Sequence, residues 1–278
     1  MQCNGVSLRY DLRPSTGRTI VLIHEMGGSL ESWEPVCERL ADFTLLRYDT
    51  RGAGLSQKIV GSCDIDQHAD DLYALLDGLE ISEPVALAGV AVGAAIAIRF
   101  AARFPDRVSH VVAMAPACGV APEARAGTLQ RAQGIREEGL AGVIDPLLDR
   151  TWPPVLREPL HTYERFRLRW LGADPGSFAA VFAMLANMSL DEDIARLPER
   201  SVLIAGEHDQ LRPPAEIARL ASFSPGIETL TVRSGHFMSL QSPRTVADLL
   251  AGFVGGGQTA AALLAAARQR HPSEVSDA

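Results

Sequence analysis

The chain has 278 residues, of which 47% are hydrophobic and 22% are charged. Its 34 acidic residues outnumber its 26 Lys and Arg residues, which gives a formal net charge of −8. These proportions are typical of a soluble folded protein and exclude collagen-like, disordered and disulfide-stapled chains. An acidic balance also argues against nucleic acid and anionic membranes as partners, because clustered cations bind both of these surfaces.

Three further features of the sequence bear on the cellular location of the protein. The longest nearly apolar stretch, residues 85–98, contains two glycines and is shorter than the roughly 20 residues that span a bilayer. Residues 1–4 show no basic start before an apolar run, so no secretory signal is expected. Cys3, Cys37, Cys63 and Cys118 form no C-x-x-C pair, which predicts reduced thiols and a cytoplasmic location.

Strand-like runs alternate with helix-like patterns in the first part of the chain. The runs TIVLIH and SVLIAG lack polar alternation, as is typical of strands buried on both faces. The order predicts an α/β fold with a mostly parallel sheet covered by helices on both faces. The expected elements are strands at 6–13 and 19–24, a helix at 29–40 with Ser29 as N-cap, a strand at 45–48, a helix at 66–79, a strand at 85–88, a helix at 92–104 and a strand at 108–114.

The alternation stops between about Gly119 and Pro198, where the sequence is helix-like throughout. We interpret residues 120–197 as a helical cap inserted into a core formed by residues 1–119 and 198–278. The expected elements from the cap onward are helices near 124–138, 155–171 and 178–188, strands at 202–205 and 227–232, helices at 214–222 and 243–253, and an Ala-rich terminal helix behind a glycine hinge. The final eight residues are expected to be disordered.

The most informative segment is GVAVG at residues 89–93, between a predicted strand and a predicted helix. Two glycines around a central residue permit a very tight turn, because neither carries a Cβ that would clash. The central side chain is then held beside a helix N-terminus, whose free N–H groups favour negative charge. This is the G-x-S-x-G nucleophile elbow with Ala91 in the serine position.

Further segments strengthen this interpretation. They occur in the linear order elbow, acid, histidine, and together they resemble the α/β-hydrolase superfamily. The similarity is to cap-bearing members such as 3-oxoadipate enol-lactonases and related amide or carbon–carbon bond hydrolases. The segments are HEMGG at 24–28, YDTRGAGLS at 48–56, GEHD at 206–209 and SGH at 234–236.

The resemblance implies roles for particular residues. His236 would be the general base and Asp209 the carboxylate that orients it, because a carboxylate on one ring nitrogen fixes the tautomer and stabilises the imidazolium. The backbone N–H groups of Met26 and Val92 would form the oxyanion hole. His24 would be a buried scaffold residue.

Glu25 departs from the family pattern, which usually has glycine there. Its side chain either places a carboxylate near the site or turns away into a salt bridge with Arg51, and we favour the salt bridge. Glu25 is retained among the candidate substrate-binding residues.

Ala91 decides the mechanism, because a methyl group cannot attack a carbonyl. Either a serine has been replaced at this position, or the natural protein has no nucleophile and His236 activates water directly. A third option, Cys118 as a substitute nucleophile, is disfavoured because it follows a different strand and buried thiols are usually inert.

The cap contributes further candidates for substrate binding. An arginine under the cap would hold a substrate carboxylate bidentately, although a solvated cationic row on an amphipathic helix explains the same pattern. The cationic residues are Arg157, Arg165, Arg167 and Arg169. The candidates that we single out for the substrate pocket are Trp152, Arg165, Met188 and Phe237.

The leading hypothesis is an enzyme that hydrolyses a small ester, lactone or amide, with a carboxylated substrate as one option. The first alternative is a cofactor-free, non-hydrolytic enzyme that uses the His/Asp pair as a base, and the second is a non-catalytic ligand-binding protein. The sequence carries no nucleotide-binding loop and no zinc-like spacing, so no cofactor or metal is expected. The expected partner is a small molecule, and a homodimer is the default assembly.

Overall fold

The computed structural model describes residues 1–271 and 274. Its main sheet has seven strands in the order β3-β5-β4-β6-β7-β8-β9. Strand β3 pairs antiparallel with β5, and the other neighbours are parallel. The prediction of a mostly parallel sheet is confirmed. The strands are β1 (Gln2–Cys3), β2 (Val6–Ser7), β3 (Tyr10–Arg13), β4 (Thr19–Ile23), β5 (Thr44–Tyr48), β6 (Val85–Val90), β7 (Val108–Met114), β8 (Ser201–Gly206) and β9 (Glu228–Val232).

Helices connect these strands and follow the last one. The α-helices are α1 (Glu34–Cys37), α2 (Ile65–Gly78), α3 (Val92–Arg103), α4 (Arg125–Glu138), α5 (Ala141–Thr151), α6 (Leu160–Leu171), α7 (Pro175–Asn187), α8 (Asp191–Ile194), α9 (Pro214–Ala221), α10 (Met238–Gln241), α11 (Pro243–Leu250) and α12 (Ala260–Arg270). The shorter turns are η1 (Leu30–Trp33), η2 (Pro105–Arg107), η3 (Pro122–Ala124), η4 (Pro154–Leu156) and the π-helical η5 (Ala251–Gly255).

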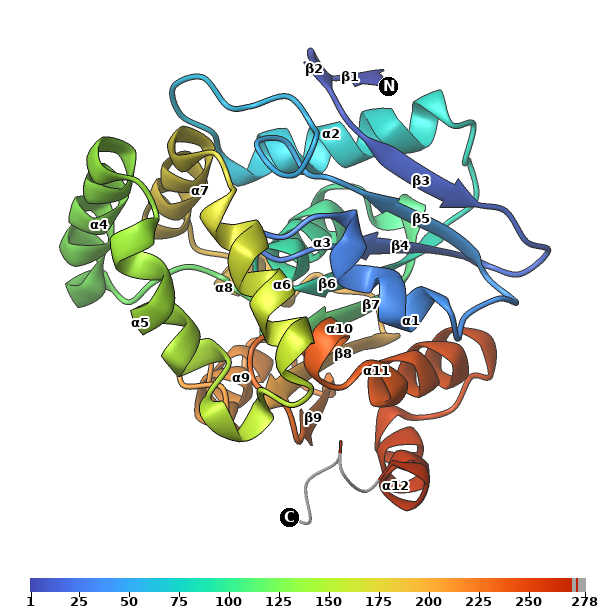
Figure 1. Ribbon diagram of the computed structural model, residues 1–278. Coiled ribbons are helices and arrows are strands. Elements are labelled where there is room, and N and C mark those ends of the chain that lie inside the picture. The colour runs from blue at the N-terminus through green and yellow to red at the C-terminus, as the bar shows by residue number, and fades with distance from the viewer. Residues whose placement is uncertain (272–273, 275–278) are drawn as a thin grey trace.

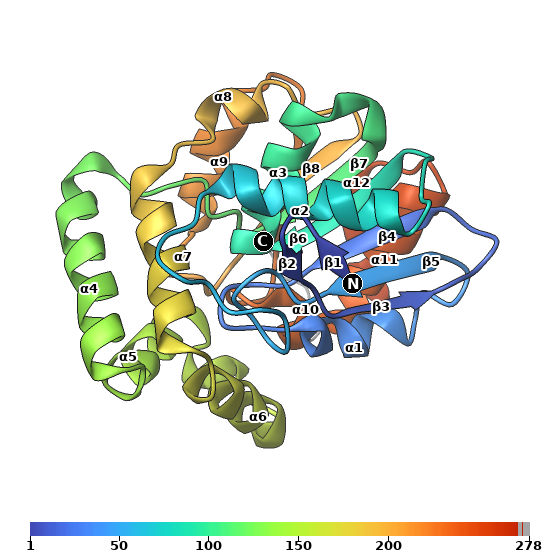
Figure 2. The ribbon, with the colours of Figure 1, turned by 90° about the horizontal axis from the view of Figure 1, so that it is seen from above.

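Helices cover both faces of the sheet (Figure 2), and an apolar core lies between the helices and the sheet on each face. Successive residues of a strand point to opposite faces. In β4, Val21 and Ile23 therefore pack with α2, α3 and α9, whereas Ile20 and Leu22 pack with α1, α11 and α12. Both faces of β4 are covered, which explains why its sequence shows no polar alternation.

The insertion between β7 and β8 is helical, as the sequence predicts. Helices α4, α5, α6 and α7, which we call the cap helices, lie together on one side of the sheet (Figure 1). They enclose a third apolar cluster that includes Trp152, Phe166 and Trp170, and Phe237 from the loop after β9 joins it. The cap therefore packs on the loop that carries the candidate catalytic histidine.

The predicted boundaries fail where a local contact interrupts a regular pattern. The strand expected at 6–13 is two strands, because the N–H of Arg9 donates to the Ser56 hydroxyl instead of a neighbouring strand. The helix expected at 29–40 is η1 followed by α1, and Ser29 makes no side-chain cap. The helix expected at 155–171 is η4 followed by α6, with Pro159 immediately before α6.

Of the two helices predicted near the C-terminus, one is confirmed and the other ends earlier than expected. The terminal helix is confirmed as α12, whereas the helix expected at 243–253 ends at Leu250 and continues as η5. The prediction of disorder in the final eight residues falls largely on 272–273 and 275–278, which lie outside the described residues. Of the other two, His271 hydrogen-bonds Asp248, and Glu274 binds Arg244 and the N–H of Thr245. No helix within the described part of the chain is long and apolar enough to span a membrane.

The turn between β6 and α3 depends on two glycines with no free space around them. A Cβ on Gly89 would lie 2.3 Å from the Gly93 backbone, and one on Gly93 would lie 2.2 Å from the Ile23 carbonyl oxygen. Both contacts are with backbone, which has little freedom to move away. The N-terminus of α3 is therefore pressed directly against the end of β4.

We expect Gly93→Ala to lower the free energy of unfolding by about 1–3 kcal/mol, because the added methyl overpacks this contact. Gly134→Ala is the matched control, since Gly134 lies within α4 and a Cβ there would meet nothing within 4 Å. The control should raise the free energy of unfolding by about 0.5–1 kcal/mol. Urea denaturation of both variants checks this, and a Gly93→Ala protein as stable as the parent would contradict it.

Candidate active site

Ala91 sits at the tight turn between β6 and α3 in an unusual conformation. Its φ is 53° and its ψ is −111°, a region that residues other than glycine rarely adopt. Its N–H donates to the Met114 carbonyl at 2.9 Å, and its own carbonyl accepts from the N–H of Ala95 and of Ala117. The residue is thus held at the strand-to-helix junction that the GVAVG pattern predicts.

His236 and Asp209 form a buried pair from the loops after β9 and β8. The Nδ1 atom of His236 lies 2.6 Å from Asp209 Oδ2. Asp209 Oδ1 accepts from the N–H groups of Leu211 and Arg212 at 2.8 and 3.0 Å. With Nδ1 held by the carboxylate, Nε2 of His236 is the ring nitrogen left to act as a base.

The carboxylate of Asp209 keeps its negative charge in this setting. Burial acts to raise the pKa of Asp209, but the charge and hydrogen bond of His236 and the N–H groups of Arg212 and Leu211 lower it. The lowering interactions prevail, and the pKa falls below its usual value.

One cavity brings the predicted catalytic positions together. It has a volume of about 320 Å³, and its wall includes Ala91, Val92, His236, Met26 and Phe237. Val92 is the first residue of α3, so its N–H has no acceptor within the helix. The Met26 N–H likewise donates to no other described residue. We call this space the catalytic cavity.

Glu25 lies in the same wall, against the expectation of a salt bridge with Arg51. Arg51 instead forms a bidentate pair with Asp71, with N···O distances of 2.6 and 2.5 Å. Glu25 is 1% exposed and accepts from the Ser32 hydroxyl at 2.7 Å. The salt-bridge expectation was wrong, because Asp71 on α2 offers Arg51 a nearer carboxylate.

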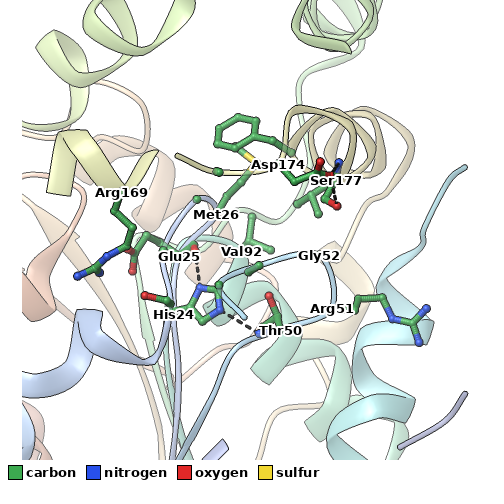
Figure 3. A pocket seen from close by; sticks show the side chains of 18 of the residues that line it. His24, Glu25, Met26, Thr50, Arg51, Gly52, Val92, Arg169, Asp174 and Ser177 are labelled. Carbon is green, nitrogen blue, oxygen red and sulfur yellow. Dashed lines mark hydrogen bonds between the residues drawn. The ribbon is translucent and has the colours of Figure 1, made fainter. Parts of the chain in front are cut away.

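A second cavity of about 720 Å³ adjoins the first and shares Glu25, Met26 and Val92 with it. Figure 3 shows it, with Arg51 directed away from the other labelled side chains. We call it the adjoining cavity. His24 lies in its wall, with Nδ1 2.6 Å from the Glu25 carbonyl, and its Nε2 accepts from the Thr50 N–H at 3.0 Å. His24 therefore carries its proton on Nδ1 and holds the loop, as expected of a scaffold residue.

A family model described as alpha/beta hydrolase fold matches residues 18–243, well over half of the chain. The chain belongs to the α/β-hydrolase fold family.

Individual members of this family resemble the chain along most of its length. The 3-oxoadipate enol-lactonase 2 of Acinetobacter baylyi is 25% identical over 242 residues, which span 86% of this chain and 90% of the relative. Among solved structures, the enol-lactonase of Burkholderia xenovorans LB400 superposes with a TM-score of 0.82 at 26% identity, covering 91% and 98% of the two chains. A thermophilic esterase from Thermogutta terrifontis, with malate bound, has a TM-score of 0.83 at 25% identity and covers 91% and 95%.

Three candidate substrate-binding residues lie elsewhere in this α/β-hydrolase fold. Trp152 is buried in the cap cluster, where its Nε1 donates to the Leu156 carbonyl. Met188 lies beyond α7 in the wall of a different hollow, beside Cys118. Arg165 is on the solvent face of α6 and lines neither cavity. Helical periodicity does not reveal which face of α6 meets the cavity, which explains the wrong choice of Arg165. Trp152 and Met188 follow the ends of α5 and α7, where the tertiary path of the chain sets the direction of the side chain.

The catalytic cavity instead contains three arginines that sequence reasoning missed, namely Arg131, Arg150 and Arg212. Arg212 makes no ion pair with any described residue, and its Nε is buried without a hydrogen-bond partner among them. Burial lowers the pKa of Arg212 below its usual value. Its place three residues after Asp209 was an available signal, whereas nothing in the sequence marks Arg131 or Arg150.

Cys118 does not join the catalytic cavity. It is buried beside α8 and α9, and burial raises the pKa of its thiol to about 12. A thiol with so high a pKa is a poor nucleophile at neutral pH. Within residues 1–271 and 274, no group of three or more His, Cys, Asp and Glu side chains is arranged to hold a metal ion.

We expect the contribution of Asp209 to stability to depend on pH. A carboxylate whose pKa is lowered by folding stabilises the protein above its unfolded value of about 3.9, and this stabilisation is lost as the pH falls through the folded value. Asp209→Asn should therefore be less stable than the parent at pH 7, and the gap should narrow below about pH 4.

Urea denaturation at several pH values between 7 and 3 measures this gap. Asp77→Asn at an exposed position of α2 is the control and should change little throughout. A gap that stays constant down to pH 3 would contradict the lowered pKa.

Proposed function

We propose that the protein is a hydrolase that acts on a small carboxylated ester, lactone or amide. The observation that carries this proposal is the shared cavity of about 320 Å³ in which His236, paired with Asp209, and Ala91 form parts of one wall. The membership of the α/β-hydrolase family and the likeness to enol-lactonases and an esterase support the same class of reaction.

With alanine at position 91, the chemistry proceeds by direct attack of water. Nε2 of His236 takes a proton from a water molecule while the water oxygen bonds to the substrate carbonyl carbon. The N–H groups of Met26 and Val92 stabilise the resulting oxyanion, and such a donor typically contributes about 3 kcal/mol. Collapse of the intermediate breaks the bond to the leaving group, which receives the proton from His236, and Asp209 stabilises the imidazolium in between.

The carboxylated substrate is supported by the charge of the catalytic cavity. A partly buried arginine without a carboxylate partner attracts an anionic ligand, which compensates its desolvation. Arg212 is half-buried and makes no ion pair with a described residue, and Arg131 and Arg150, both exposed, add positive charge to the same wall. The Thermogutta terrifontis esterase, whose structure contains the dicarboxylate malate, is consistent with this preference.

Ala91 also supports a second candidate, in which His236 removes a proton from the substrate itself and no hydrolysis follows. The methyl group leaves the base in place and removes the nucleophile that acyl-enzyme chemistry requires. This candidate is a cofactor-free, non-hydrolytic reaction in the same cavity, and it is separated from hydrolysis by the products that form.

Installing a hydroxyl at the elbow tests the mechanism. We expect Ala91→Ser to raise the hydrolysis of 4-nitrophenyl acetate by on the order of 100-fold or more, because it completes a Ser-His-Asp triad. Intact-mass spectrometry should then detect a transient acyl adduct. The double variant Ala91→Ser, His236→Ala is the control and should lose the gain. Equal rates with and without the hydroxyl, and no adduct, would count against a hydrolytic elbow at this position.

Removing the charge of Arg212 tests the substrate class. We expect Arg212→Gln to weaken the binding of monomethyl succinate by about 10- to 100-fold, since a charged hydrogen bond contributes about 1.5–3 kcal/mol. Binding of methyl butyrate, which lacks the carboxylate, should change little. Arg165→Gln on the exposed face of α6 is the matched control. Titration calorimetry in the His236→Ala background, which does not turn the ligands over, measures both ligands on the protein with and without Arg212→Gln and with Arg165→Gln, six pairs in all. Unchanged binding of the monoester to Arg212→Gln would refute the role of Arg212.

A further inference from the structure

The Glu25 carboxylate has one oxygen bound and one without a partner. Oε1 accepts from the Ser32 hydroxyl at 2.7 Å, and Ser32 in turn accepts from Arg169 Nη1 at 2.9 Å. Oε2 is buried and has no hydrogen-bond partner among the described residues. Glu25 as a whole is 1% exposed, so bulk solvent does not satisfy this oxygen.

The fold gives Glu25 no direct cation. Arg51, the partner that the sequence analysis expected, is bound to Asp71. No Lys, Arg or His within the described residues lies within ion-pair distance of Glu25. Arg169, on α6, supports it only through the Ser32 hydroxyl (Figure 3 shows Arg169 and Glu25 side by side). Because a buried polar oxygen without a donor costs about 1–3 kcal/mol, the free Oε2 indicates a place for a donor from a ligand.

The position of Glu25 decides which part of a ligand that donor belongs to. Glu25 directly precedes Met26, whose N–H is one of the two proposed oxyanion donors, and it lines the catalytic cavity and the adjoining cavity alike. A ligand group that reaches Glu25 therefore lies beside the oxyanion donor at Met26.

Two other buried polar atoms of the catalytic cavity complete the pattern. The indole Nε1 of Trp170 and Nε of Arg212 are both donors, and both lack a partner among the described residues. Three residues of the cavity wall thus each carry a buried polar atom without a partner among the described residues, namely two donors and one acceptor. A complementary ligand offers acceptor oxygens to Trp170 and Arg212 and a hydrogen-bond donor to Glu25.

We propose that Glu25 is a specificity-determining residue that selects substrates with an N–H beside the reacting carbonyl, so that the enzyme prefers carboxylated amides to the corresponding esters. This inference rests on the proposed function, since it assumes that the carboxylate binds at Arg212. An ester places an acceptor oxygen where the amide has its N–H, and two acceptors facing each other repel. Sites built to bind a donor reject analogues that lack it.

The test compares two ligands that differ in one atom, N-methylsuccinamate and monomethyl succinate. Titration calorimetry on the full chain carrying His236→Ala, which lacks the base and therefore does not turn the ligands over, gives both dissociation constants. We expect the amide to bind at least about tenfold more tightly than the ester. In Glu25→Gln, whose amide both donates and accepts, the ratio should fall to within about threefold of one. Thermal melting confirms that Glu25→Gln is folded, and the comparison of the two ligands with Glu25 intact needs no change at that position.

The outcomes separate this inference from the proposed function. If both ligands bind the parent equally and Arg212→Gln weakens both, the role of Glu25 is overturned and the carboxylated substrate class stands. If neither ligand binds, or if Arg212→Gln changes nothing, the proposed substrate class fails and the inference fails with it. A preference for the amide that persists in Glu25→Gln would also overturn the assignment to Glu25.

Discussion

The site depends on the close approach of α3 to β4. Gly89 and Gly93 bring the backbone of the turn to within a distance that no side chain tolerates, and Ala91 is held there at a positive φ. A non-glycine residue in such a conformation costs on the order of 1–3 kcal/mol, which the surrounding packing has to offset. The strained turn fixes the positions of two groups. The side chain at position 91 and the N–H of Val92 both lie at the end of the sheet, beside the loop that carries Met26.

The charged groups around this turn differ in how completely the fold satisfies their hydrogen bonds. Asp209 has every oxygen bound and a protonatable partner, so its burial is compensated within the fold. Glu25 is buried and Arg212 is half-buried, and each has a buried polar atom without a partner among the described residues. Fully satisfied groups are explained by the structure alone, whereas partly satisfied ones lining a cavity indicate what a ligand has to supply.

The cap helices contact the loops of the candidate active site in two places. Its aromatic cluster packs on Phe237 beside His236, and the N–H of His236 donates to the Thr151 carbonyl at the end of α5. Arg169 reaches the core through Ser32 and so towards Glu25. The helices that cover the cavity therefore also hold the loops from which the proposed catalytic groups project.

The sequence alone determined the parts of this protein that depend on local pattern. Unbroken apolar runs predicted the buried strands, paired glycines predicted the turn at Ala91, and the order of the motifs identified the family, because each of these signals lies within a few neighbouring residues. The tertiary structure alone decided which charges meet. Arg51 binds Asp71 and leaves Glu25 in the wall of the catalytic cavity. Arg212, Arg131 and Arg150 line the same cavity, whereas Arg165 does not. Those pairings join residues far apart in the chain, and the rotation of each helix about its own axis, which sets them, is fixed by packing that no local pattern records.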